Sequence, residues 1–121
     1  MEALRVLVAD DSAIERETLA GILRLAGHEV AVAHDGEQAL GMAVERRYDA
    51  IFMECDMPAG SGEAFLSHYR AIGGAAPVIL VTAQRDRARL SPVVSLGIHG
   101  LVTKPVTPAR VLDALSGLRA G

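Results

Sequence analysis

Five short apolar runs alternate along the chain with longer segments whose apolar residues recur at helical spacing. The predicted strands are Leu4–Ala9, Glu29–Ala33, Ala50–Met53, Val78–Val81 and Gly100–Thr103. Four of these runs are largely apolar, as parallel strands covered on both faces are, whereas "HEVAVAH" alternates and suits an edge strand. This strand–helix alternation predicts an α/β fold, a doubly wound parallel sheet with helices on both faces.

The helices between the strands are predicted from their caps and apolar stripes. Ser12 with Glu15 three residues later has the pattern of a capping box, and Gly27 ends that first helix. The other helices are expected to start at Asp35-Gly36, to span Gly62 to Ile72, and to start at Thr107-Pro108. The inward positions are expected to be Ile14, Leu19, Ile22, Leu23 and Leu25, then Ala39, Leu40, Ala43 and Val44, and finally Val111, Leu112, Leu115 and Leu118.

Proline at position 92 interrupts the segment where a fourth helix is expected. A proline inside a helix costs about 3 kcal/mol, so we expect Ser91 to cap a short helix that begins at Pro92. Residues 84–90 are then a loop. That loop carries three arginines that either form a solvated basic surface or contact an acidic partner or the region of Glu54: Arg85, Arg87 and Arg89.

The 121-residue length suits one domain, residues 1–121, with a continuous core. A formal net charge of −3 argues against nucleic acid as a direct partner. The single cysteine, Cys55, cannot form an internal disulfide and is expected to be a small packed residue. Because no signal peptide or membrane-spanning stretch is visible, we expect a soluble cytoplasmic domain without membrane contact.

Polar side chains stand where four of the five predicted strands end: Asp10-Asp11, Glu54, Thr82 and Lys104. The carboxyl ends of parallel strands share one edge of the sheet, where ligands of such folds bind. Carboxylate oxygens suit a hard divalent ion, Mg²⁺ first, whereas a lysine ammonium and a threonine hydroxyl suit a phosphoryl group. Each feature alone has a structural explanation, such as helix capping. Their combination predicts a small phosphoryl-transfer site.

Four segments resemble the signatures of one family in order and spacing: "VLVADDS", "YDAIFMECDMPAGSG", "VILVTA" and "LVTKPVTP". Over its full length the chain resembles the receiver (CheY-like) domains of two-component response regulators. The resemblance implies a flavodoxin-like sheet with strand order 2-1-3-4-5 and a signalling domain that is not an enzyme. It also implies that a histidine kinase or a histidine phosphotransfer protein donates a phosphoryl group, and that an output domain is a further partner. "DAIFMECDMP" and "KPVTPARVLDAL" resemble receivers attached to hybrid sensor kinases.

The resemblance also implies roles for individual residues. The acidic corner would hold Mg²⁺ through Asp10 (by way of water), Asp11, Glu54 and the backbone carbonyl of Asp56. Glu54 takes the phosphoacceptor position, and Thr82 and Lys104 would contact the phosphoryl oxygens. Lys104-Pro105 resembles the cis peptide of the family. Leu101 stands where receivers have a switching aromatic, which puts the usual coupling between that ring and the threonine in doubt.

Glutamate at position 54 departs from the aspartate of the family pattern. The extra methylene moves the carboxylate further into the pocket, by about 1.5 Å. We therefore predict weak phosphorylation or none, and partial imitation of the phosphorylated state through a pair with Lys104 or Thr82. Glu54 is either native, which we favour, or an engineered substitution in an ordinary receiver.

Two further functions compete with this interpretation. The chain could be a phosphate-independent adaptor or a homodimerisation domain on the same fold. A small flavin-binding enzyme is disfavoured, because "ADDSAIE" is acidic where a flavin phosphate loop would lie. A phosphatase-like enzyme could use Asp10 or Asp11 as its nucleophile, but Thr82 and Lys104-Pro105 fit a receiver better.

Overall fold

A sheet of five parallel strands forms the centre of the structure, in the order β2-β1-β3-β4-β5. The strands are β1 (Arg5–Ala9), β2 (Glu29–Ala33), β3 (Ala50–Glu54), β4 (Val78–Thr82) and β5 (Gly100–Thr103). The structure is a computed structural model that describes residues 3–55, 57, 62–83 and 97–120. The predicted α/β fold and flavodoxin-like strand order are confirmed.

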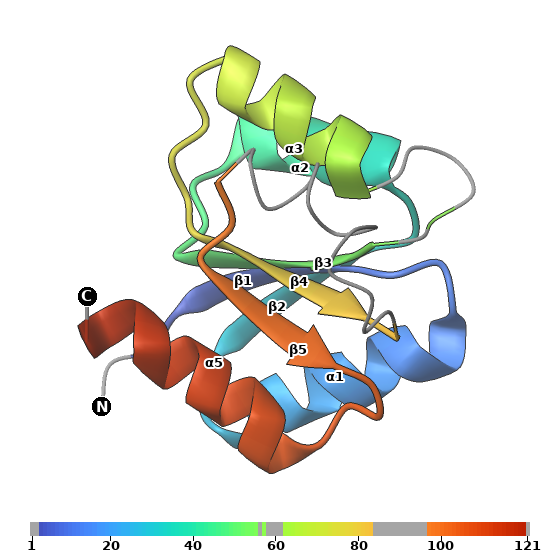
Figure 1. The fold of residues 1–121 in the computed structure, drawn as a ribbon, viewed down its shortest axis with the longest axis vertical. Helices are drawn as coiled ribbons and strands as arrows, with labels where there is room; N and C mark the ends of the chain where they lie inside the picture. The colour runs from blue at the N-terminus through green and yellow to red at the C-terminus, as the bar shows by residue number, and fades with distance from the viewer. Residues whose placement is uncertain (1–2, 56, 58–61, 84–96, 121) are drawn as a thin grey trace.

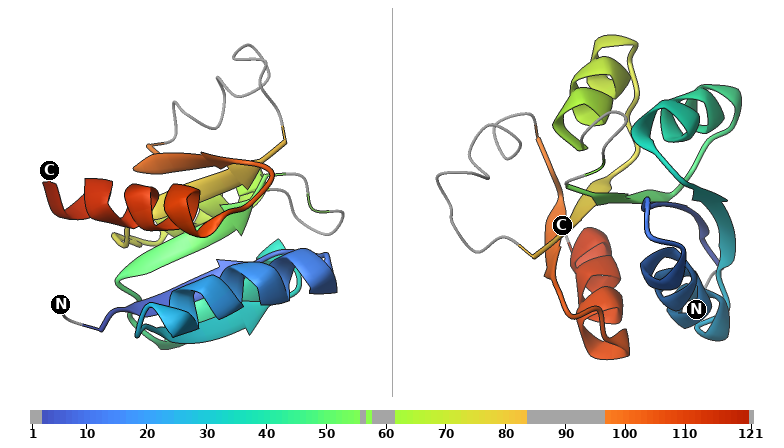
Figure 2. Two further views of the ribbon diagram at one scale, coloured as in Figure 1. Left: turned by 90° about the horizontal axis from the view of Figure 1, so that it is seen from below. Right: turned by 90° about the vertical axis from the view of Figure 1, so that its right-hand side faces the viewer.

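Four helices of the described chain cover the sheet in two layers. They are α1 (Ala13–Leu25), α2 (Gly36–Glu45), α3 (Gly62–Ala71) and α5 (Pro108–Ala120). Figures 1 and 2 show α2 and α3 on one face of the sheet and α1 and α5 on the other. Within these described elements no helix is both long and apolar enough to cross a membrane.

The strand ends differ slightly from the predicted bounds. β3 continues to Glu54 and β4 to Thr82, because Glu54 pairs in register with Val81 and Thr82 with Thr103. The two polar residues are therefore the last members of their strands, held by the hydrogen-bonded ladder. β1 begins at Arg5, one residue later than expected.

Side chains alternate between the two faces of the sheet, and each face has its own buried cluster. Leu7 and Ile51 lie under α2 and α3, whereas Val8 and Phe52 lie under α1 and α5. Every residue of β3 and β4 is buried, while β2 is an edge strand with mostly half-buried residues, as its alternating sequence predicts.

Side-chain caps explain where the helices begin. The Ser12 hydroxyl accepts a hydrogen bond from the Glu15 amide (3.3 Å), and Asp35 accepts one from the Gln38 amide (2.7 Å). Only half of the predicted capping box forms, because the Ser12 amide donates to Asp10 and not to Glu15. The Glu15 side chain is thereby available for another contact.

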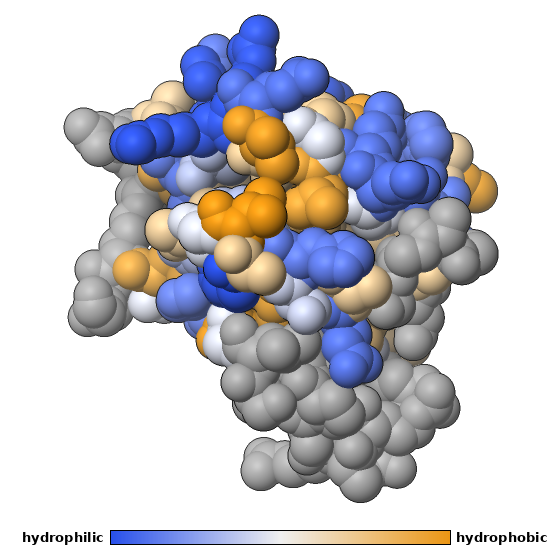
Figure 3. Space-filling model, turned by 90° about the horizontal axis from the view of Figure 1, so that it is seen from above, coloured by the Kyte–Doolittle hydropathy of each residue, from blue (hydrophilic) through white to orange (hydrophobic). Residues whose placement is uncertain are grey.

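Four residues expected to face inward are exposed instead: Ile14 (82%), Leu25 (92%), Val44 (62%) and Leu112 (37%). Helix geometry explains the errors, since each residue turns the chain by about 100°. Ile14 precedes the buried Leu19 by five positions and so lies well away from its direction. Figure 3 looks down on the α2 and α3 side, where hydrophobic surface lies among hydrophilic surface.

The turn from α3 to β4 packs around Tyr69. The Tyr69 ring stacks on Phe65 with centroids 5.4 Å apart, and its hydroxyl accepts a hydrogen bond from the Ala76 amide. Gly73 ends α3 with a φ of 87°, a left-handed conformation that glycine adopts readily. A Cβ on Gly74 would lie 2.3 Å from the Tyr69 ring, so any larger residue at position 74 would force the ring to shift.

Candidate functional site

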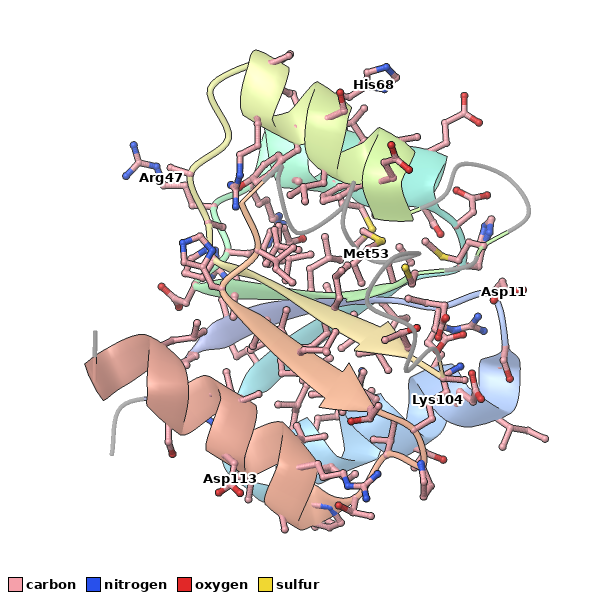
Figure 4. The ribbon with its side chains drawn as sticks, viewed as in Figure 1. Asp11, Arg47, Met53, His68, Lys104 and Asp113 are labelled. Carbon is pink, nitrogen blue, oxygen red and sulfur yellow. The ribbon has the colours of Figure 1, made fainter. Side chains whose placement is uncertain are left out.

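The strand ends bring the predicted polar residues to one edge of the sheet. Asp10 directly follows β1, Glu54 and Thr82 end β3 and β4, and Lys104 directly follows β5. Since all five strands are parallel, these positions lie at the same edge. Figure 4 shows Asp11 and Lys104 at this edge, on the right of the view.

Lys104 lies between two carboxylates. Its Nζ is 2.6 Å from Oε2 of Glu54 and 2.6 Å from Oε2 of Glu15. The Glu54 side chain is only 5% exposed, whereas that of Glu15 is 39% exposed. The prediction that Glu54 pairs with Lys104 or Thr82 is therefore met at Lys104, and the pair compensates a charge that burial would otherwise disfavour.

Burial and charge act oppositely on the pKa of Lys104. Burial lowers this pKa, but the hydrogen bond to Glu15, the ion pair with Glu54 and the charges of both carboxylates raise it more strongly, so the net shift is upward. Lys104 is consequently a fixed cation at neutral pH, suited to holding anionic oxygens.

Asp10 is the most buried acid beside this pair, with 2% of the residue exposed. Burial raises its pKa to about 6, and the charges of Glu54 and Glu15 add to the rise. A hydrogen bond from the Ser12 amide (2.9 Å) and the charge of Lys104 act in the opposite direction. Arg16 donates to the Asp10 carbonyl oxygen at 2.9 Å and fixes the start of α1.

Three carboxylates of the described chain could share a cation. Oxygen atoms of Asp10, Glu15 and Glu54 lie within 4.8 Å of one another. These are hard oxygen ligands. Burial, and to a smaller extent the charges of Glu54 and Glu15, raise the pKa of Asp10, so a nearby cation would stabilise its carboxylate, and the set fits Mg²⁺.

The structure and the sequence differ in part on which acids form this group. Asp11, a predicted direct ligand, is exposed and is not a member, while Asp56 lies outside the described residues. Glu15 was assigned only to a helix cap. Its position in the first turn of α1, shortly after Asp10-Asp11, was the sequence signal that could have placed Glu15 at the site.

Comparison with known proteins decides the family. The sequence model described as response regulator receiver domain matches residues 6–116.

The chain belongs to the response regulator receiver domains.

The similar proteins differ in how much of their own length this receiver covers. A response regulator receiver protein of Anaeromyxobacter sp. (Anae109_2439) is 35% identical over 109 residues, covering 90% of this receiver and 46% of that protein. The sensory/regulatory protein RpfC of Xanthomonas campestris is 30% identical, covering 98% of this receiver and 17% of that protein. The chemotaxis protein CheY of Thermotoga maritima is 32% identical, covering 93% of this receiver and 94% of that protein. This receiver thus spans less than half of the first two relatives and almost all of the third.

Solved structures agree with this fold. The chemotaxis protein CheY4 of Vibrio cholerae superposes with a TM-score of 0.89 at 29% identity, covering 95% of this receiver and 98% of that chain. The two-layered helix arrangement of Figure 2 is therefore that of a CheY-like receiver.

The receiver holds Lys104 through its backbone as well as its side chain. The Lys104 amide donates to the carbonyl oxygen of the buried Thr82 at 2.9 Å. The Lys104-Pro105 peptide is cis, as predicted. Arg110 donates to the carbonyl oxygens of Thr103 (2.9 Å) and Pro105 (3.1 Å), on either side of Lys104.

The predicted output residues are only partly described. Leu101 of the receiver is 45% exposed on β5. The basic segment with Arg85, Arg87 and Arg89, and the helix expected from Ser91 and Pro92, lie outside the described residues. Cys55 is buried in the cluster under α2 and α3, as a packed residue should be.

Proposed function

We propose that this receiver has Glu54 at its phosphoacceptor position, is phosphorylated weakly or not at all, and signals through protein–protein contacts. The observation that supports the proposal most is the 2.6 Å distance between Glu54 Oε2 and Lys104 Nζ. In receivers the corresponding lysine is expected to contact the phosphoryl group. Here the longer acidic side chain already reaches that ammonium.

Phosphorylation would require a carboxylate oxygen of residue 54 to bond to phosphorus while the bond from phosphorus to the donor's leaving atom breaks. That atom is an imidazole nitrogen in a phosphohistidine and a carboxylate oxygen in acetyl phosphate. The extra methylene displaces the attacking oxygen by about 1.5 Å. A misplacement of about 1 Å can cost about a hundredfold in rate. Because Glu54 is also buried and paired with Lys104, we expect slow transfer.

The same displacement supports partial imitation of the phosphorylated state. Glu54 supplies one negative charge next to Lys104, whereas an aspartyl phosphate would supply nearly two. Thr82, buried at the end of the neighbouring strand, is the proposed second contact of a phosphoryl group.

Asp11 and Glu54 are the proposed direct ligands of Mg²⁺, with Asp10 acting through water and the Asp56 carbonyl as a further ligand, as the family resemblance implies. Bound Mg²⁺ would neutralise charge on the carboxylates and on an incoming phosphoryl group. The close approach of Asp10, Glu15 and Glu54 supports a cation at this edge.

The proposed partners are a histidine kinase or a histidine phosphotransfer protein, and an output domain. Similarity to RpfC and to a hybrid signal transduction histidine kinase of Dictyostelium discoideum supports a place in such a relay. A phosphate-independent adaptor or homodimer is the second candidate. It is favoured by Leu101 and Leu112, which are 45% and 37% exposed on the packed pair β5 and α5.

Incubation with acetyl phosphate and Mg²⁺ tests the proposal. We expect little or no label on the wild-type chain and rapid, Mg²⁺-dependent label after Glu54→Asp, because the shorter side chain restores the position of the attacking oxygen. Glu54→Gln, which keeps the length but cannot form an acyl phosphate, is the control. Equal labelling of wild type and Glu54→Asp would refute the proposal, and no label on either would indicate the phosphate-independent module.

A further inference from the structure

Glu15 contacts the site from the helix layer. It lies in the first turn of α1, 89 positions before Lys104, and its Oε2 accepts a hydrogen bond from Lys104 Nζ at 2.6 Å. The three side chains are graded by exposure, with Glu54 at 5%, Lys104 at 21% and Glu15 at 39%. Glu15 therefore holds the ammonium from the solvent side while Glu54 holds it from the interior.

We propose that Glu15 is a positioning residue that fixes the Lys104 ammonium and competes with phosphoryl anions for it. This inference rests on the proposed function, because it concerns the same lysine. Glu15 lies in a helix, unlike the site residues at the strand ends. We expect its carboxylate to weaken the binding of anions at the site and to strengthen the binding of cations.

The competition follows from hydrogen-bond capacity and charge. A lysine ammonium has three N–H donors, and here two carboxylates lie at hydrogen-bond distance from it. An anion that needs this ammonium must share it with Glu15. The Glu15 carboxylate also lies within 4.8 Å of those of Asp10 and Glu54, so its charge repels an approaching anion and attracts a cation.

The chain offers an unusually clean probe, because Lys104 is its only lysine. A sample labelled with ¹⁵N-lysine gives one Nζ signal, whose proton exchange with water reports the hydrogen bonds of this ammonium. Glu15→Gln keeps an acceptor oxygen and removes the charge. Glu17→Gln is the matched control on the same helix, since Glu17 pairs with Arg24 at 3.8 Å.

In the first experiment we expect Glu15→Gln to accelerate exchange of the Lys104 ammonium protons by about two- to fivefold, since a partly exposed ion pair is weakened and not abolished. Glu17→Gln should leave the exchange rate at the wild-type value. An unchanged rate in Glu15→Gln, or the same change in Glu17→Gln, would overturn the assigned contact.

The second experiment measures competition without covalent chemistry. Inorganic phosphate is titrated, with Mg²⁺ saturating, into Glu54→Asp and into Glu54→Asp with Glu15→Gln, and the Lys104 Nζ signal is followed. The half-saturating phosphate concentration should be about two- to fivefold lower with Glu15→Gln. Equal concentrations, or no response to phosphate in either protein, would overturn the competition. Absence of acetyl phosphate labelling in Glu54→Asp would instead count against the proposed function.

Discussion

At position 54, where the family resemblance predicts aspartate, glutamate adds a single methylene group, and the effect of that group depends on the neighbouring side chains. Glu54 is almost fully buried and lies 2.6 Å from Lys104. Asp10, which is also buried, shares the same negative surroundings and has its pKa raised to about 6. Among the residues that the structure describes, one ammonium thus lies at the same edge as three carboxylates.

Asp10 gives the site a specific dependence of stability on pH. Its pKa is about 6 in the folded chain and about 4 in an unfolded chain, so the folded state holds the proton more tightly. The stability that protonated Asp10 provides is complete below about pH 4 and is lost as the pH rises through about 6. Asp10→Asn, which keeps an oxygen for the Ser12 amide, should therefore be more stable than wild type at pH 7, and the difference should vanish near pH 4.

Urea denaturation of both proteins in EDTA, at several pH values from 4 to 7.5, measures this difference in the free energy of unfolding. A difference that does not change with pH would show that the carboxyl group of Asp10 does not titrate in this range.

At the scale of helices and strands, side-chain packing at the end of one element determines the path by which the chain reaches the next. The α3–β4 turn shows this, because the Tyr69 ring lies against Gly74 while its hydroxyl binds the Ala76 amide. Arg70 adds to the turn by donating to the carbonyl oxygens of Gly74 and Ala76. The chain therefore reaches β4 along a defined path.

Gly74→Ala tests this packing. A Cβ at position 74 would meet ring atoms of Tyr69 at 2.3 Å, so the ring must shift, and we expect the free energy of unfolding to fall by about 1–3 kcal/mol. Gly21→Ala, in the middle of α1 with no atom within 4 Å of the added methyl group, should instead stabilise the chain by about 0.5–1 kcal/mol. Thermal unfolding followed by circular dichroism measures both, and equal effects of the two substitutions would contradict the packing argument.

The sequence was sufficient for the fold because apolar runs, caps and glycine stops are local signals. It was also sufficient to place Glu54 and Lys104 at one edge, since parallel strands fix which ends meet. It was insufficient for Glu15, whose partner lies 89 positions away, and for Ile14 and Val44, whose direction depends on the exact phase of each helix. Contacts that depend on tertiary packing cannot be predicted from the local spacing of apolar residues.

At the scale of the whole molecule, the acidic edge should couple ion binding to folding. Asp10, Glu15 and Glu54 come from two strand ends and a helix, so they approach each other only in the folded chain. A ligand that binds only the folded state stabilises it in proportion to the logarithm of its concentration over its dissociation constant.

Addition of 10 mM Mg²⁺ should therefore raise the midpoint of thermal unfolding by about 2–6 °C if it is well above the dissociation constant. The rise should be much smaller in Asp10→Asn and should persist in Glu17→Gln. Differential scanning fluorimetry at constant ionic strength, with NaCl replacing MgCl₂ in the control, measures it. An equal rise in Asp10→Asn would place the ion elsewhere.

The single lysine at this edge has a practical consequence for handling the protein. Reagents directed at primary amines can attach only at Lys104 or at the amino terminus of the chain. Amine coupling to a sensor surface would thus tether a fraction of molecules through the very group that pairs with Glu54. Binding measurements with immobilised protein should therefore attach the chain through an affinity tag and not through its amines. An amine-reactive cross-linker, in turn, would selectively capture a partner that binds close to Lys104.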